Sequence, residues 1–427
     1  MYKFLLIVSL SLFTGVLRAQ DINSIINEKE VERVETTLSS DDMQGRKTFS
    51  PGIEKAADFI SNEFKKAGLQ TFNKAASYRQ SFYMLKPMLI SASCILNGQT
   101  IEQDNVIVIT TKPEINLKQE TSFEQVTIGP ADRLFNKAQE LVQSGKNYIA
   151  FVDTSFRKNF SRLAGFKRQL QPTVGSVVFV LTDQAAKEYS VQAKHSFDTL
   201  KLSNIVGVLP GKTKPDEYVI FSGHYDHLGI GKAVKGDSLY NGANDDAAGT
   251  TAIILLAKYF KALHNNERTI IFTAFTAEEI GGFGSQYFSK QLDPLKVVAM
   301  FNIEMIGTES KWGANSAYIT GYEKSDMGSI LQKNLTGSAF TFYPDPYTAE
   351  NLFYRSDNAT LARMGVPAHT VSTSKMDNEP NYHQPSDEIG TLNMTNMAEI
   401  IKAIALSSKG IISGKETPSR VDTSQLK

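Results

Sequence analysis

Imidazole and carboxylate side chains recur where apolar, strand-like segments of this sequence end. One segment ends at His224 and Asp226, a second at Glu278 and Glu279, and a third at Glu304. Imidazoles combined with carboxylates suit Zn²⁺ or a similar first-row ion, whereas sites built from oxygen alone suit Ca²⁺ or Mg²⁺. The residue types therefore predict a zinc-type metal site.

Roles that need no metal ion explain the acidic residues near these segments only in part. Asp245 and Asp246 precede a helical segment, and one of them is expected to cap it while the other stays available. Glu278 and Glu279 follow an apolar run, where two adjacent buried carboxylates repel each other unless a cation or a proton lies between them. Glu304 also follows an apolar run, where burying it unpaired is costly. A bound cation resolves all of these conflicts together.

The candidate metal ligands exceed the number that one ion needs. They share an imidazole or a carboxylate placed at or after a strand-like segment, and they are His224, Asp245, Glu279, Glu304 and His383. One bridging carboxylate would divide them into two three-ligand sites with a shared water, which is the pattern of two-metal hydrolases. Glu278 then remains for acid–base chemistry, and Asp226 is close enough in sequence to hold the far ring nitrogen of His224.

Strand-like and helical segments alternate from residue 204 onward and would position these side chains. The strand-like segments are 204–211, 218–226, 268–279, 297–307 and 366–373, and the helical ones are 246–263, 284–292, 327–335 and 396–412. This alternation predicts an α/β fold with a mixed, largely parallel central sheet sandwiched by helices. In such sheets the ligand-binding groups gather at the carboxyl ends of the strands.

The sequence between residues 85 and 200 has a different texture, with short β-rich runs and one helical stretch near Ala138. We interpret it as an inserted β-rich lobe, with the main domain formed by residues 20–84 and 201–412. Residues 27–84 are expected to be helical, and residues 413–427 to form a frayed polar tail. The single cysteine, Cys94, is expected to be a packed small hydrophobe rather than a reactive thiol.

Residues 1–19 have the features of a cleavable leader: Lys3, an apolar stretch over residues 4–17, and the small residue Ala19 before the cleavage point. Fourteen apolar residues are too few to span a bilayer, which takes about 20. We therefore expect an exported protein, periplasmic or secreted, without a membrane span. Lys plus Arg and Asp plus Glu both number 45, so no net positive charge favours nucleic acid as a partner.

Several short motifs together resemble the zinc aminopeptidases of the M28 peptidase family. The matching segments are HYDHLG (224–229), GANDDAAG (242–249), TAEEIGGFGS (276–285), NIEMIG (302–307), FYRSDN (353–358) and YHQPSDE (382–388). Met43–Arg46 and the helical segment at 54–69 resemble the start of the family's catalytic domain. Residues 85–200 match only loosely, as a protease-associated-type insert.

The resemblance implies an exported aminopeptidase that acts on peptides with a free amino terminus and carries two zinc ions per chain. Asp245 would bridge the two ions. Glu279 and His383 would complete one site, and His224 and Glu304 the other. The resemblance leaves the oligomeric state open.

The resemblance also implies roles for three residues beside the metals. Glu278 would be the general base, taking a proton from water and giving it to the leaving amine. Asp226 would orient His224. Tyr382 would stabilise the tetrahedral oxyanion, although an aromatic wall of the pocket is an equally good interpretation of this side chain.

Two positions depart from the family's pattern. Glu304 stands where the family usually has Asp, and its longer side chain is expected to shift one metal rather than remove it. The usual Ser-Asp-His reads Ser356-Asp357-Asn358, which leaves the polarity of the substrate pocket open.

Other functions are compatible with the same fold. A glutaminyl cyclase would bind one zinc and form pyroglutamate, and a carboxypeptidase-like relative would accept substrates with a blocked amine. A receptor-like domain without catalysis would have no need for five ligands and a base.

Overall fold

A computed structural model describes residues 21–118, 122–167, 170–172 and 175–424. The chain forms two compact units, a discontinuous unit of residues 1–80 and 204–427 and an inserted unit of residues 81–203. The sequence had suggested boundaries at 84/85 and 200/201. The expected leader, residues 1–19, lies outside the described residues.

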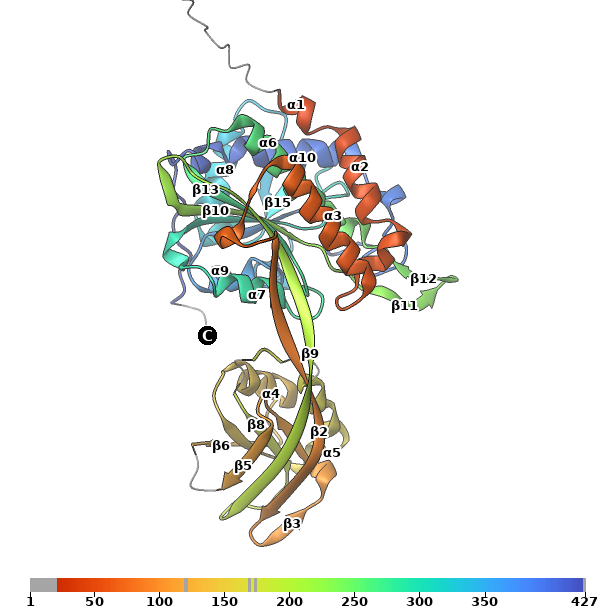
Figure 1. Ribbon diagram of the computed structural model, residues 1–427, viewed down its shortest axis with the longest axis vertical. Coiled ribbons are helices and arrows are strands. Elements are labelled where there is room, and N and C mark those ends of the chain that lie inside the picture. Colours follow the sequence, from red (N-terminus) through yellow and green to blue (C-terminus); the bar gives the residue numbers. More distant parts are fainter. Residues whose placement is uncertain (1–20, 119–121, 168–169, 173–174, 425–427) are drawn as a thin grey trace, which may run out of the picture. The chain divides into compact units, whose positions relative to one another are not determined.

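The discontinuous unit is built on part of an 11-stranded mixed sheet, in the order β16-β15-β17-β14-β10-β13-β9, and the order continues to β2 (Arg79–Leu96) and β3 (Gln99–Ile101). Figure 1 labels β10, β13 and β15 of this sheet. The strands are β9 (Tyr189–Leu209), β10 (Lys214–His224), β13 (Arg268–Phe275), β14 (Val297–Ile303), β15 (Ser316–Ile319), β16 (Thr341–Pro344) and β17 (Ala368–Ser372). The four central strands, β13, β10, β14 and β17, are parallel to one another. β9 runs antiparallel to β13, and β15 runs antiparallel to β17 but parallel to β16. The expected mixed, largely parallel sheet is confirmed.

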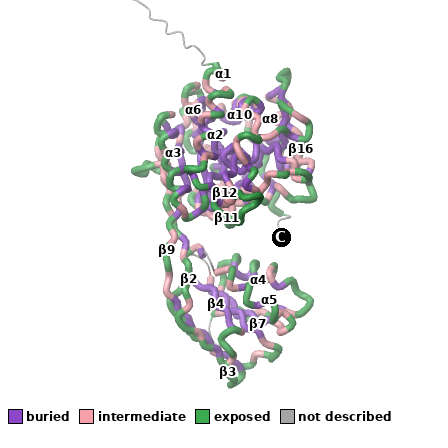
Figure 2. Tube along the Cα trace, turned by 90° about the vertical axis from the view of Figure 1, so that its right-hand side faces the viewer, coloured by how far each residue is buried: buried purple, intermediate pink, exposed green. Residues whose placement is uncertain are grey.

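Helices cover both faces of this sheet, as predicted from the alternating sequence pattern. One face carries α2 (Glu28–Leu38), α3 (Pro51–Ala67), α6 (Ala248–Leu263), α8 (Met327–Asn334) and α10 (Met394–Ser407), and the other carries α7 (Phe283–Ser289) and α9 (Ala359–Arg363). Successive residues of β10 alternate between the two cores, Phe221 packing in the first and Ile220 in the second. Purple buried residues accordingly fill the centre of this unit in Figure 2.

The segment before the insertion is only partly helical. In α3 the predicted apolar face is buried at Ala56, Ile60 and Phe64, and Gly68 ends the helix with a φ of 75°. Two short helical elements precede it, α1 (Ile22–Ile25) and the 3-10 turn at Asp41–Arg46. The prediction of helix up to residue 84 is wrong, because β1 (Gln70–Thr71) pairs with β9 and a long strand begins at Arg79.

The inserted unit has its own four-stranded sheet in the order β4-β8-β7-β6. Its strands are β4 (Val106–Ile109), β6 (Glu124–Ile128), β7 (Tyr148–Val152) and β8 (Val177–Leu181). Helices α4 (Leu134–Gln143) and α5 (Arg157–Phe160) pack on one face, and β2 (Arg79–Leu96), β3 (Gln99–Ile101), β5 (Glu114–Lys118) and part of β9 pack on the other. Cys94 is buried in β2, and burial raises the pKa of its thiol to about 11, as expected for a packed small hydrophobe.

The carboxyl-terminal residues are not the frayed tail that their polar composition suggested. The buried guanidinium of Arg268, at the start of β13, donates to the carbonyls of Ile411 and Glu416. Arg420 donates to the carbonyl of Val297 at the start of β14, and Val421 is buried. A buried cation needs acceptors, and the end of α11 (Lys409–Ile412) and the backbone after it supply them.

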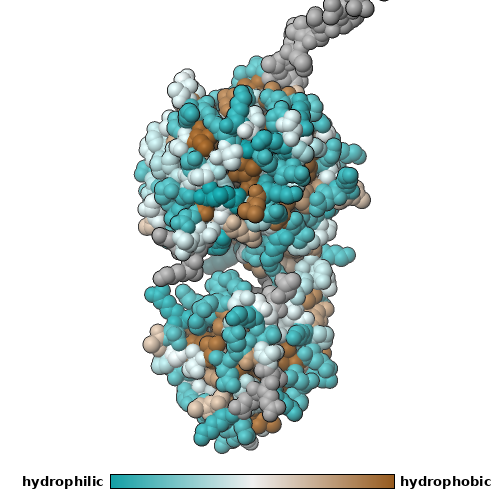
Figure 3. All heavy atoms as spheres, turned by 90° about the vertical axis from the view of Figure 1, so that its left-hand side faces the viewer, coloured by the Kyte–Doolittle hydropathy of each residue, from teal (hydrophilic) through white to brown (hydrophobic). Residues whose placement is uncertain are grey.

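On the faces drawn in Figure 3, hydrophilic residues predominate and hydrophobic ones are scattered. Such scattering is usual for surfaces that contact water. Within the described part of the chain, no helix has both the length and the apolar character that crossing a membrane requires.

Candidate metal centre

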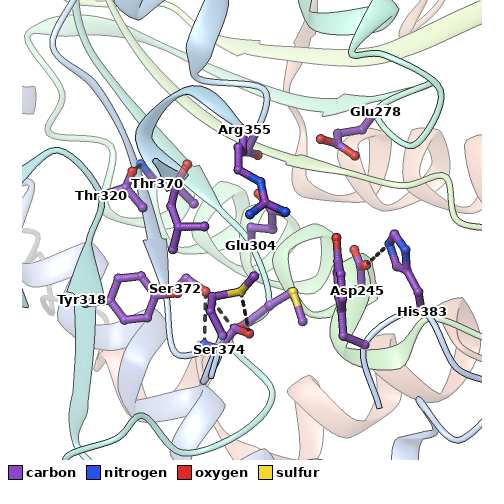
Figure 4. A pocket seen from close by; sticks show the side chains of 15 residues that line it. Asp245, Glu278, Glu304, Tyr318, Thr320, Arg355, Thr370, Ser372, Ser374 and His383 are labelled. Atoms are coloured by element: carbon purple, nitrogen blue, oxygen red, sulfur yellow. Dashed lines mark hydrogen bonds and ion pairs between the residues drawn. The ribbon is translucent and has the colours of Figure 1, made fainter. Parts of the chain in front are cut away.

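The carboxyl ends of the parallel strands bring the predicted donors together. His224 is the last residue of β10, Glu304 follows β14 directly, and Glu279 lies in the turn after β13. Asp245 lies between the hairpin of β11 (Gly229–Val234) and β12 (Asp237–Tyr240) and helix α6, and His383 lies in the loop after β17. Figure 4 shows Asp245, Glu304 and His383 around one pocket. All five predicted ligands therefore contribute to one edge of the sheet.

Asp245 lies between two imidazoles. Its Oδ1 is 3.1 Å from Nε2 of His224, and its Oδ2 is 3.2 Å from Nε2 of His383. The Asp245 side chain is 3% exposed. Each carboxylate oxygen thus faces a different histidine, which is the arrangement a bridging ligand requires.

Two groups of donors share Asp245. In the first, ligand atoms of His224, Asp245 and Glu304 lie within 4.8 Å of one another, and in the second those of His227, Asp245 and Glu279 do. Nε2 of His383 is also 3.2 Å from Oε2 of Glu279. The side chain of Glu304 thus reaches the first group.

His227 belongs to the second group and was not among the predicted site residues. Its Nδ1 is 2.8 Å from Oε1 of Glu279 and 3.8 Å from Oδ2 of Asp245. The sequence contained a signal, because His227 follows His224 and Asp226 in the same segment. The sequence predicts one imidazole ligand from this segment, His224. Only the tertiary structure shows that His227 also lies among the donors.

Asp226 contacts His224 differently from the prediction. The group within hydrogen-bond distance of His224 Nδ1 is the backbone carbonyl of Asp226, at 3.0 Å, whereas the nearest carboxylate oxygen is at 3.8 Å. The carboxylate instead accepts the backbone N–H groups of Glu278 and Glu279 and the hydroxyl of Thr48. The Asp226 side chain therefore orients the turn that carries the two glutamates, and its backbone orients His224.

Asp246 performs the capping that the sequence assigned to one of the two aspartates. Its carboxylate accepts the N–H groups of Gly249, His224 and Met305, which belong to α6, to the end of β10 and to the residues after β14. A Cβ at position 249 would collide with this carboxylate, so glycine is required there. The cap holds two strand ends and one helix in register at the site.

Asp387 is a second positioning residue that the sequence did not single out. Its two carboxylate oxygens accept the N–H groups of Asn244 and Asp245, at 2.8 and 3.0 Å. The side chain of Asn244 accepts the N–H of Gly307. The loop that presents Asp245 is thus fixed from two other segments.

The electrostatics of the protein groups favour a cation at this edge. Burial alone would raise the pKa of Asp245, but the hydrogen bonds of His224 and His383 outweigh burial and lower it well below its usual range. Burial alone would lower the pKa of His383, but Asp245 and Glu279 raise it to about 10. Burial raises the pKa of Glu278 well above its usual value. The carboxyl groups of Glu278, Glu279 and Glu304 therefore repel one another at this edge, and a cation would relieve that repulsion.

The donor set fits zinc. It offers imidazole nitrogen and carboxylate oxygen, the ligands that zinc accepts in catalytic sites. Nε2 of His224 is buried without a hydrogen-bond partner of normal geometry, although it lies 3.1 Å from Asp245. A buried imidazole nitrogen in this state is suited to binding a metal ion.

A pocket opens beside these donors (Figure 4). Glu278 and Arg355 line it together with hydroxyl-bearing residues of the sheet edge, and the ring of Tyr382 lines it while stacked on His383 at 3.9 Å between centroids. Asn358 does not line it. Its amide donates to the carbonyls of Phe353 and Ala368 in the interior, so this departure from the family's pattern does not change the polarity of the pocket.

The fold and this donor set define a class of protein, an α/β protein with a carboxylate-rich metal centre at the carboxyl ends of parallel strands. Residues 204–407 match the family model described as Peptidase family M28. The matched segment contains every predicted ligand and Glu278. Residues 204–407 of this chain therefore belong to peptidase family M28.

Relatives among curated proteins match shorter stretches. A probable zinc metalloprotease of Pyrenophora tritici-repentis (strain Pt-1C-BFP) is 36% identical over 111 residues, 25% of this chain and 25% of the relative. Aminopeptidase YwaD of Bacillus subtilis (strain 168) is 26% identical over 228 residues, 49% of this chain and 44% of the relative. The chain thus spans about a quarter of the length of the first of these relatives and less than half of the second.

Solved structures share the fold over almost the whole chain. An aminopeptidase from Aneurinibacillus sp. strain AM-1 has a TM-score of 0.55 at 17% identity and covers 95% of this chain and 98% of its own. The zinc aminopeptidase BSAP from Bacillus subtilis has a TM-score of 0.55 at 16% identity, with coverage of 93% and 98%. At this identity the likeness shows the fold alone.

Proposed function

We propose that this chain is a zinc-dependent aminopeptidase that removes amino-terminal residues from peptides. The observation that carries the proposal is the position of Asp245, whose two carboxylate oxygens face His224 and His383 separately. Two donor groups around one shared carboxylate favour two zinc ions over one. The family match and the relatives named zinc metalloprotease and aminopeptidase support the same reaction class.

In the proposed reaction the zinc ions, when bound, would lower the pKa of water and polarise the peptide carbonyl. Glu278 lies in the same pocket as Asp245 and Glu304 but belongs to neither donor group. Its carboxylate would take a proton from the attacking water and deliver it to the nitrogen of the leaving amine. The turn that carries Glu278 is held by Asp226, which fixes the direction of this proton transfer.

Two other side chains would act on the substrate. The hydroxyl of Tyr382 would donate a hydrogen bond to the oxyanion of the tetrahedral state. Burial raises the pKa of Tyr382, so this hydroxyl keeps its proton at neutral pH. Glu304 belongs to the first donor group and lines the pocket, and its carboxylate would attract the free α-amine.

The substitution Glu278→Gln tests the role of the base. We expect wild-type zinc content and loss of at least 100-fold in kcat for amino-acyl amides, since general-base catalysis contributes about 10² to 10⁴. Zinc content is measured by elemental analysis, and activity with a panel of chromogenic amino-acyl substrates. The control is Glu323→Gln, an exposed glutamate of the same unit. Retained activity in Glu278→Gln would remove this residue from the base role.

The same measurements separate the proposal from its alternatives. About two zinc ions per chain are expected, whereas a glutaminyl cyclase would hold one. Hydrolysis of substrates with a blocked amine would indicate a carboxypeptidase-like reaction instead. Absence of zinc from the purified and zinc-reconstituted protein would contradict the metal centre itself.

We also propose that residues 1–19 are a leader that is removed during export to the periplasm or the medium. The support is the charged, apolar and small-residue pattern of this segment. Amino-terminal sequencing of the protein from its native host should then begin at Gln20. A mature protein that begins at Met1 would contradict export by this route.

A further inference from the structure

His227 is held rigidly beside the metal ligands. Its side chain is 0% exposed, and its ring lies edge-on to His383 at 5.8 Å between centroids. A Cβ at Gly242 would come within 2.5 Å of this ring, so the neighbouring backbone packs tightly against it. The imidazole therefore has little freedom to change its contacts.

The surroundings of His227 assign its tautomer. The charged groups near Nδ1 are two carboxylates, with Glu279 Oε1 at 2.8 Å and Asp245 Oδ2 at 3.8 Å. A carboxylate oxygen only accepts hydrogen bonds. If Nδ1 carried no proton, its lone pair would therefore be repelled by the lone pairs of Glu279 Oε1. Nδ1 consequently carries the proton and donates it to Glu279.

Distances separate this role from that of a metal ligand. Two ligands about 2.0 Å from one tetrahedral zinc ion lie about 3.3 Å apart. The distances from His383 Nε2 to Asp245 Oδ2 and to Glu279 Oε2 are both 3.2 Å, and that from His224 Nε2 to Asp245 Oδ1 is 3.1 Å. The 2.8 Å between His227 Nδ1 and Glu279 Oε1 is shorter than these three distances and is an ordinary N–H···O hydrogen-bond distance, whereas 3.1–3.2 Å lies at the upper end of that range.

We propose that His227 is a positioning residue that holds Oε1 of Glu279, so that Oε2 is presented to the metal beside His383. This inference rests on the proposed function, since it takes Glu279 as a zinc ligand. A carboxylate ligand without such a donor can rotate or bind through both oxygens. Groups that orient metal ligands in this way contribute about 10- to 100-fold to metal affinity.

Two substitutions at position 227 test the donor. The side-chain nitrogen of asparagine can occupy the position of histidine Nδ1, whereas leucine branches at the same carbon without a donor. We expect His227→Leu to weaken binding of one of the two zinc ions by about 10- to 100-fold. His227→Asn should restore wild-type affinity. Zinc alone is the probe, and its dissociation constants are measured by competition with a chromophoric chelator.

His383→Asn provides the matched contrast. Asparagine cannot replace Nε2, so this variant should lose one zinc ion although His227→Asn keeps it. Loss of zinc in His227→Asn equal to that in His383→Asn would make His227 a direct ligand and overturn the proposal. Unchanged zinc affinity in both position-227 variants would also overturn it. If His227→Leu does not fold, the zinc affinities of His227→Asn and His383→Asn still distinguish a positioning residue from a direct ligand.

Failure of the proposed function is distinguishable from failure of this inference. A wild-type protein that binds zinc but does not cleave amino-acyl amides would contradict the aminopeptidase proposal, while the ranking of the position-227 variants could still hold. Conversely, an active two-zinc enzyme whose zinc affinity is insensitive to His227→Leu would leave the function standing and remove His227 from its positioning role.

Discussion

Adjacent acidic residues at this metal centre have different tasks. Asp245 faces two imidazoles, whereas Asp246 accepts three backbone N–H groups from three segments. Glu279 faces His227 and His383, whereas its neighbour Glu278 belongs to neither donor group. The chemistry of each residue is therefore set by the groups that its oxygen atoms meet, not by its residue type.

At the residue scale, the proposed bridging role of Asp245 predicts which zinc ions each substitution affects. Asp245→Asn replaces one shared oxygen with an amide nitrogen, which does not bind zinc, so we expect both ions to bind more weakly. Glu304→Gln should affect only the ion held with His224, because Glu304 belongs to the first donor group alone. Zinc titration of the two variants checks this difference. Asp216→Asn, an exposed aspartate, is the control. Equal losses in the first two variants would contradict a bridge.

At the element scale, a single arginine connects the segments around the site. Arg46 is buried and donates to the carbonyls of Leu38, Tyr225, Asn241 and Gly242. The turn at residues 41–46 thereby holds both the end of β10 and the loop that leads to Asp245. Substitution of Arg46 would leave these four buried carbonyls without a hydrogen-bond donor. We therefore expect such a substitution to destabilise the folded protein.

Helices α2, α3 and α6 meet at Glu63, which is 1% exposed and pairs with Arg33, Lys66 and Lys258. Burial alone would raise the pKa of Glu63, but the hydrogen bonds of Lys258, Lys66 and Arg33 outweigh burial and lower it to about 2. The folded state therefore holds this proton less tightly than the unfolded state. The resulting stabilisation is complete above the ordinary value of 4.5 and is lost as the pH falls towards 2.

Glu63→Gln should therefore lower the free energy of unfolding by about 2 kcal/mol at pH 7, because charged hydrogen bonds are replaced by neutral ones. The difference from wild type should shrink as the pH falls below about 4.5. Urea denaturation of zinc-loaded protein at several pH values measures both effects, with Glu323→Gln as the exposed control. A difference that stays constant down to acid pH would contradict the lowered pKa.

At the scale of the whole molecule, the two units differ in their relation to metal. Both donor groups found in the described part of the chain belong to the discontinuous unit. The inserted unit has a four-stranded sheet of its own, β4-β8-β7-β6, and its own apolar cores, although β2, β3 and β5 belong to the same 11-stranded sheet as β10 and β13. A ligand that binds only folded protein stabilises the unit that binds it, by about 2.7 kcal/mol when its free concentration is 100 times the dissociation constant.

Removal of zinc with a chelator should consequently weaken one unit selectively. Hydrogen exchange of the intact chain should become faster in peptides from β10, β13 and β14, and stay unchanged in peptides from β4, β7 and β8. Addition of zinc should restore the slow exchange. Unchanged exchange at the carboxyl ends of β10, β13 and β14 would contradict the assignment of the metal to this edge of the sheet.

The full lengths of the long strands β2 and β9 were not predicted from the sequence. β9 runs from Tyr189 to Leu209 and belongs to both units, which join at Ser203 and Asn204. Its polar middle section resembles a loop in composition, since Asp198 and Lys201 are exposed there. The backbone of such a polar section is held in a strand by hydrogen bonds to neighbouring strands, and the local sequence does not reveal these partners.

The sequence by itself determined the order of the central parallel strands and their helices from residue 204 onward, the sheet class and the chemical types of the donors, because apolar periodicity and residue type are local properties. Only the tertiary structure decided that His227 joins the donors, that the Asp226 carboxylate holds a turn, and that Asn358 is interior. Each of these outcomes depends on hydrogen bonds between distant segments, such as that from the backbone N–H of Glu278 to the carboxylate of Asp226. The spacing of residues along a helix or strand determines on which face of that element a side chain lies. It does not determine which residue of a distant segment will contact that side chain.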